Sequence, residues 1–326
     1  MQQYRDTNYA AVSAALHARE AHLLTQALSE RMLEAPTAEE SCKILIECGY
    51  PPIEHCTLGE VEHLLALSRA ELYREVAVLA PDKRLVELFQ LKYDYHNAKL
   101  ALKAKLTGED VSRLVIGCGR YDAAALLRGE RGMLSSRMGR AMAQAEKEAE
   151  GGDVRQAELT LDRACFEEMS ELAGATGNEF LIGYVALQID AINLRTLVRA
   201  QRMGASDELL SAALLPGGHI PANQLKTARG DRLAELTRGS ALSSAGELAA
   251  ATLGGSGSLT VFERACDDAL VRYLQRARRT PFGPEVIVGY LSAKEAEFTA
   301  VRTILSGKLA GLDAEDIRAR LRLSYL

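Results

Sequence analysis

Apolar residues recur along most of the chain with the three-to-four-residue period of an amphipathic α-helix, and the strict alternation typical of strands is scarce. The pattern predicts an all-α fold. Helices are expected over residues 8–33, 37–46, 58–79, 81–106 and 140–172, the last with an interruption at Gly151-Gly152. Residues 227–258 carry the weakest signal, because their serine and glycine clusters predict a connector with at most one short helix.

The segment IDAINLRTLVRAQRMG, residues 189–204, places a carboxylate where the pattern predicts burial. Asp190 lies about 40° around the helix from Leu194, within the apolar stripe that also contains Ala191 and Val198. A buried carboxylate is costly unless it is paired or hydrogen-bonded. We therefore expect Asp190 to fix its helix to a neighbouring helix through an arginine, a lysine or a backbone amide.

The same arrangement occurs three times along the chain. The segments YDYHNAKLALKAKLTG, residues 93–108, and KEAEFTAVRTILSGKLAG, residues 294–311, repeat it in register. Each copy has an acid, a base and a closing glycine, and the first two also have an asparagine that Ala300 replaces in the third: Asp94, Asn97, Lys99 and Gly108; Asp190, Asn193, Arg195 and Gly204; Glu297, Arg302 and Gly311. The apolar stripe is repeated as Tyr95, Ala98, Leu102; Ala191, Leu194, Val198; and Phe298, Val301, Leu305.

A repeat of roughly 100 residues predicts three similar helical units. Their expected boundaries are residues 1–118, 119–225 and 226–326, the last beginning with a linker. We expect the repeated acids, asparagines and bases to be structural residues that hold the helices in place.

Composition changes this picture by excluding classes of protein. The chain has 326 residues, of which 48% are hydrophobic and 25% charged, as in an ordinary globular protein. Its formal net charge of −5 argues against a nucleic-acid binder. The six cysteines form no C-x-x-C pair and the chain opens without an apolar leader, which predicts reduced thiols in a cytoplasmic protein. The best apolar run, residues 180–187, is shorter than the roughly 18 residues of a membrane helix, so no bilayer insertion is expected.

The motifs of several enzyme classes are absent from the sequence. It contains no G-x-x-x-x-G-K-[ST] loop, no G-x-S-x-G elbow and no paired Glu-x-x-His, and Asp267-Asp268 lacks the third acid of a prenyl-diphosphate lyase. His96 is not repeated, because the other copies have Ile192 and Thr299 at its position. The sequence therefore predicts no catalytic residue, no metal site and no cofactor.

One basic cluster allows two interpretations. The run VRYLQRARR contains Arg272, Arg276, Arg278 and Arg279, which is more positive charge than a helix C-terminus requires. The cluster is either a solvated helix face or a contact surface for an acidic protein partner.

In combination, these segments resemble the C subunit of the prokaryotic A-/V-type rotary ATPases, the counterpart of the d subunit of eukaryotic V-ATPases. The resemblance covers essentially the whole chain and is carried by two motifs. They are D-x-x-N-L-R, at Asp190, Asn193, Leu194 and Arg195, and K-E-x-E…V-R, at Lys294, Glu295, Glu297, Val301 and Arg302. The chain departs from the family at Gly49-Tyr50, where a threonine often precedes the tyrosine; this bears on a local turn.

The resemblance implies a funnel-shaped protein of three helical bundles around a pseudo-threefold axis, with a central cavity. It further implies a non-catalytic adaptor at the cytoplasmic face of the membrane, which joins the D and F subunits of the central shaft to the proteolipid ring and transmits torque. The stator protein of the membrane sector is a further expected partner, whereas nucleic acid is not. The coupling ion, H+ or Na+, is not encoded here. Two other classes stay open: a helical enzyme or ligand-binding domain, and a free-standing helical-repeat scaffold that binds a soluble protein.

Overall fold

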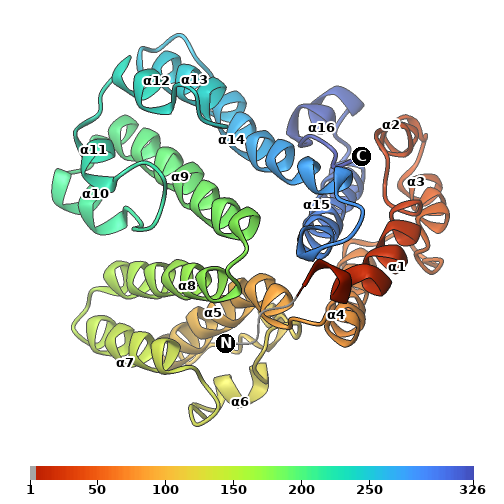
Figure 1. Cartoon of the computed structure of the whole chain (residues 1–326), viewed down its shortest axis with the longest axis horizontal. Coiled ribbons are helices and arrows are strands. Elements are labelled where there is room, and N and C mark those ends of the chain that lie inside the picture. The colour runs from red at the N-terminus through yellow and green to blue at the C-terminus, as the bar shows by residue number, and fades with distance from the viewer. Residues whose placement is uncertain (1–4) are drawn as a thin grey trace. The chain divides into compact units, whose positions relative to one another are not determined.

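The computed structural model describes residues 5–326, and every regular element within this range is a helix (Figure 1). The all-α prediction is confirmed. The α-helices are α1 (Ala10–Glu20), α2 (Gln26–Glu34), α3 (Ala38–Ile44), α4 (Leu58–Leu79), α5 (Arg84–Thr107), α6 (Ala123–Leu127), α7 (Ser136–Glu150), α8 (Val154–Thr176), α9 (Glu179–Arg202), α10 (Asp207–Ala213), α11 (Ala222–Thr227), α12 (Arg232–Thr237), α13 (Ser243–Leu253), α14 (Leu259–Leu274), α15 (Pro284–Leu309) and α16 (Ala314–Arg320). The 3-10 helices are η1 (Asp6–Tyr9), η2 (Leu45–Cys48), η3 (Ser112–Leu114) and η4 (Gln275–Arg279).

The chain forms two compact units. Among the described residues, the first unit contains residues 87–266, and the second contains residues 5–86 together with 267–326. These units divide the chain differently from the three predicted segments, so the boundaries at residues 118 and 225 stay a prediction.

The core of the first unit follows α9. Helices α8, α10, α11 and α13 all pack against it, and α7 lies beside α8 (Figure 1). Leu181, Ile189, Leu194 and Leu197 of α9 are completely buried. Because apolar burial is the main favourable contribution to folding, α9 is the element around which this unit is assembled.

The core of the second unit follows α15 in the same way. Helices α1, α2, α3, α4 and α16 pack against it. Val288, Leu291, Phe298 and Val301 of α15 are completely buried. The N-terminal and C-terminal parts of the chain therefore share one core.

The three repeated segments are helical, as predicted. They form α5, α9 and α15, and Gly108, Gly204 and Gly311 follow them with φ values of 70°, 65° and 73°. Glycine adopts this left-handed conformation most readily, which explains why each helix ends at that residue type. All nine residues of the predicted apolar stripes are buried.

The long helix predicted over residues 8–33 is interrupted, so this prediction was wrong. Helix α1 ends at Glu20 and α2 begins at Gln26, where the Thr25 hydroxyl accepts a hydrogen bond from the Leu28 backbone N–H. The Leu24 backbone N–H, which a continuous helix would use internally, donates instead to Glu297 at 2.8 Å. The interruption thus frees a donor for a buried carboxylate.

The connector predicted over residues 227–258 is also more ordered than expected. It contains two helices, α12 and α13, which pack against each other (Figure 1). A Cβ atom at Gly246 would overlap the hydroxyl of Thr237. The small residues that indicated a connector therefore allow two helices to approach closely. The other break, at Gly151-Gly152, separates α7 from α8 as predicted.

Candidate functional site: the acids of the repeated helices

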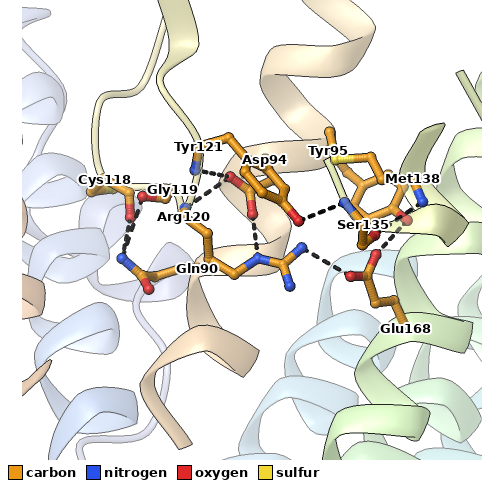
Figure 2. Close-up of polar contacts among 10 residues, drawn as sticks. All are labelled: Gln90, Asp94, Tyr95, Cys118, Gly119, Arg120, Tyr121, Ser135, Met138 and Glu168. Carbon is orange, nitrogen blue, oxygen red and sulfur yellow. Dashed lines mark hydrogen bonds and ion pairs between the residues drawn. The ribbon is translucent and has the colours of Figure 1, made fainter. Parts of the chain in front are cut away.

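The acid of α5 lies in a buried polar cluster. Asp94 is completely buried, and its Oδ1 atom accepts hydrogen bonds from the backbone N–H groups of Arg120 at 2.9 Å and Tyr121 at 3.2 Å (Figure 2). The Arg120 Nε atom donates to Oδ2 at 2.7 Å. The carboxylate therefore holds the loop before α6 against the middle of α5.

Arg120 extends this cluster to a third element. Its Nη2 atom lies 3.0 Å from the Glu168 carboxylate on α8, and the Tyr95 hydroxyl donates to the same carboxylate at 2.8 Å (Figure 2). Both acids and the guanidinium are largely withdrawn from solvent. Moving α5, α8 or the loop apart would break a buried pair and leave an uncompensated charge. The network therefore fixes the relative positions of these three elements.

The asparagine of α5 contacts the same loop. The Asn97 Nδ2 atom donates to the Ile116 carbonyl at 2.8 Å, and the Ile116 N–H donates to Asn97 Oδ1 at 3.1 Å. Asn97 is completely buried. Its side-chain amide supplies two hydrogen bonds that the loop backbone would otherwise lack. Asp94 and Asn97 together hold residues 116–121.

A second cluster, on α9, has a similar arrangement of donors. Asp190 accepts hydrogen bonds from the backbone N–H groups of His219 and Ile220, each at 3.0 Å. Asn193 exchanges two hydrogen bonds with the backbone of Leu215, both at 2.8 Å. His219 Nδ1 lies 3.1 Å from Asp190, in the role of the Arg120 side chain.

A glycine precedes the donor pair in both loops. A Cβ atom at Gly119 would overlap Asp94 Oδ1, and a Cβ atom at Gly218 would overlap Asp190 Oδ1. Only a residue without a side chain lets the backbone approach the carboxylate so closely. The sequences C-G-R-Y and G-G-H-I follow the acids at a distance of about the length of one of these helices. They are the sequence signal by which these loops could have been located.

The third acid is held by different partners. Glu297 accepts a hydrogen bond from the Leu24 N–H at 2.8 Å and from the Tyr50 hydroxyl at 2.5 Å, and Lys294 Nζ lies 2.5 Å from its Oε1 atom. Ala300, at the position of the asparagine, has no side-chain amide. Gly49, with φ of 82°, ends η2 and precedes the buried Tyr50, whose hydroxyl donates to Glu297.

Burial governs the proton affinity of these groups. Desolvation raises the pKa of the Asp94 and Asp190 carboxyls above their ordinary value, although their N–H donors act in the opposite direction. Burial also raises the pKa of the Tyr50 and Tyr95 hydroxyls, which therefore stay protonated and can donate to Glu297 and Glu168. These acids are used as hydrogen-bond acceptors.

The bases of the first and third repeats contact acids other than the repeated ones. Lys99 contacts Asp162 on α8 at 2.6 Å, and Arg302 contacts Glu62 on α4 at 2.5 Å. Arg195 is half-buried on α9. In these two repeats the acid and the base thus contact different partners. In the first two clusters, the donors that hold the acids come from the loops that follow the helices.

Two further features bear on the function. Within residues 5–326, no group of three histidine, cysteine, aspartate or glutamate side chains could hold a metal ion. Among the described residues, one helix, α9, is long and apolar enough to cross a membrane by length and composition alone, so its apolar stretch is longer than the sequence indicated. However, 61% of its most apolar window is buried inside the protein, as in a core helix.

The fold and the clusters define an all-α protein with internal helical repeats. The chain belongs to the ATP synthase (C/AC39) subunit family, whose model matches residues 12–320. It is 23% identical to the C subunit of the V-type sodium ATPase of Enterococcus hirae over 97% of this chain and 99% of that protein. It is 26% identical to the C subunit of the A-type ATP synthase of Methanocaldococcus jannaschii (96% and 86% covered) and 25% identical to that of the V-type ATP synthase of Thermus thermophilus (93% and 94%). The identification as the C subunit of a rotary ATPase is confirmed.

Proposed function

We propose that the chain is the non-catalytic adaptor of an A-/V-type rotary ATPase. It joins the D and F subunits of the central shaft to the proteolipid ring at the cytoplasmic face of the membrane and transmits torque during ATP-coupled H+ or Na+ transport. The stator protein of the membrane sector is a further contact. The three repeated units would surround a pseudo-threefold axis with a central cavity that receives the shaft.

The observation that carries this proposal is that the three repeated acids serve as buried hydrogen-bond acceptors. Asp94, Asp190 and Glu297 are buried acceptors for backbone and side-chain donors within their own units, which leaves none of them positioned to react with a substrate. A chain that transmits torque must resist deformation, and buried hydrogen-bonded networks of this kind are stiff. Membership of the ATP synthase (C/AC39) family supports the same role.

Purified components test the proposal. The full chain mixed with the D–F shaft is expected to form a complex that elutes as one species in size-exclusion chromatography, and the chain alone is expected to hydrolyse no ATP. The variant Asp190→Ala, which weakens the α9 cluster, is compared in the same assays with Lys103→Ala as its control. The adaptor role is wrong if the chain hydrolyses ATP by itself. It is also wrong if the chain fails to bind the shaft although circular dichroism shows that it is folded.

A further inference from the structure

The basic cluster at the end of α14 has no acidic partner in the described chain. Arg272, Arg276, Arg278 and Arg279 are all exposed. Within residues 5–326, none of their guanidinium groups lies within 4.0 Å of a carboxylate. Four cations in eight residues repel one another.

The backbone beneath these arginines is firmly held. Ala277, in the middle of η4, is buried, and a Cβ atom at Gly289 on α15 would lie only 2.9 Å from its Cβ atom. The Gln275 side chain donates to the Ser324 carbonyl at 3.0 Å. Such packing leaves the segment little freedom to reorganise, so the arginines project from a preformed surface.

The spacing of three of these arginines fits one helix face. Arg272 and Arg276 are four residues apart, and Arg276 and Arg279 are three apart in a 3-10 turn, so neighbouring side chains lie roughly 5 to 6 Å apart at Cβ. The Arg276 guanidinium lies over the Tyr273 ring, 5.1 Å from its centroid. Phe282, which follows η4, is 42% exposed. Arginine, tyrosine and phenylalanine are all enriched in protein interfaces.

We propose that Arg272, Arg276 and Arg279, with Phe282, form a docking surface for an acidic α-helix of a protein partner. The partner helix would carry carboxylates at positions i, i+4 and i+7, because these match the row of guanidinium groups. Arginine rather than lysine at every position favours planar, bidentate carboxylate pairing. The inference rests on the proposed function and deepens it, since it names a surface by which the adaptor holds another protein of the complex.

A synthetic helical peptide tests the surface directly. Its glutamates are placed at i, i+4 and i+7, it is labelled with fluorescein, and its binding to the full chain is followed by fluorescence anisotropy. The variant R272A/R276A/R279A is expected to weaken binding by at least about tenfold. The control R113A/R155A/R202A removes the same charge from exposed, dispersed positions and is expected to change binding by less than about twofold. Circular dichroism establishes that both variants fold.

A charge exchange adds specificity to this test. The variant R272E/R276E/R279E is expected to lose the glutamate peptide and to bind a peptide with lysines at the same three positions. Equal weakening by the two alanine variants would mean that only net charge matters and would overturn the proposal. Binding of phosphatidylserine vesicles, lost in R272A/R276A/R279A, without binding of the peptide would identify a membrane surface and would also overturn it.

The surface and the adaptor role can fail separately. If membranes without the chain lose ATP-driven ion transport but R272A/R276A/R279A binds the peptide normally, the adaptor stands and the surface is wrong. If membranes without the chain still pump, the adaptor role is wrong whatever the peptide does.

Discussion

At the scale of single residues, the acids of α5 and α9 are held mainly by backbone amides. Asp94 and Asp190 each accept hydrogen bonds from two consecutive N–H groups, and the side chain of the first donor residue adds a further contact. That residue is Arg120 in one loop and His219 in the other. The identity of this residue can differ because the shared donor is the peptide group, which every residue except proline carries. Glycine before it is the stricter requirement.

This requirement gives a first prediction, on Gly119. Gly119→Ala would place a methyl group against Asp94 Oδ1 and is expected to lower the free energy of unfolding by about 1–3 kcal/mol. Gly117→Ala in the same loop has no atom within 4 Å of the new Cβ and is the control, with an expected change near zero. Urea denaturation measures both. The cost of Gly119→Ala should shrink in an Asp94→Ala background, and equal costs in the two backgrounds would contradict the assigned contact.

A second prediction compares an acid with a base on the repeated helices. Asp190→Ala leaves the His219 and Ile220 amides without their acceptor and is expected to cost about 3–5 kcal/mol. Lys103 is exposed and its Nζ atom lies 3.4 Å from the exposed Glu109, so Lys103→Ala should be nearly neutral. Differential scanning calorimetry measures the two thermal midpoints. Equal shifts would mean that Asp190 does not stabilise the α9 cluster.

At the scale of the elements, two glycines inside helices have different effects on packing. Gly246 lies where α13 meets α12, and a Cβ atom there would overlap Thr237 and lie 3.0 Å from the Leu233 carbonyl. Gly139 lies within α7 with no atom within 4 Å of a Cβ. The first allows two helices to pack closely, whereas the second only weakens its own helix.

The third prediction follows from this difference. Gly246→Ala is expected to destabilise the α12–α13 pair and to increase amide hydrogen exchange there. Gly139→Ala is expected to stabilise the protein by about 0.5–1 kcal/mol, because alanine loses less backbone entropy in a helix. Hydrogen exchange followed by mass spectrometry, together with urea denaturation, distinguishes the two. A stabilising effect of Gly246→Ala would show that the close contact is absent.

The same elements show how far the sequence determines the fold and the site. The apolar stripe, the acid and the closing glycine predicted α5, α9 and α15, because helical periodicity and a closing glycine are local properties. The donor of Glu297 could not be predicted, since Leu24 reaches it across 273 positions in the sequence. For the same reason, the break between α1 and α2 depends on a tertiary hydrogen bond that overrides local helix propensity.

At the scale of the whole molecule, two cores account for the fold. The first unit is assembled on α9 and the second on α15, and the second joins both ends of the chain. Each core helix carries a buried acid held by donors from its own unit. The polar clusters thus add specific geometry to apolar cores, and specific, stiff geometry is what the proposed adaptor needs to transmit torque.

The most direct test of the central claim is the number of ions transported per ATP hydrolysed in membranes with and without this chain. With the chain present, ATP addition is expected to drive ion uptake into sealed vesicles. Without it, we expect the ratio to fall close to zero and the catalytic head to detach more readily at low ionic strength, while re-addition of the purified chain restores pumping. An unchanged ratio in membranes that lack the chain would contradict the adaptor role.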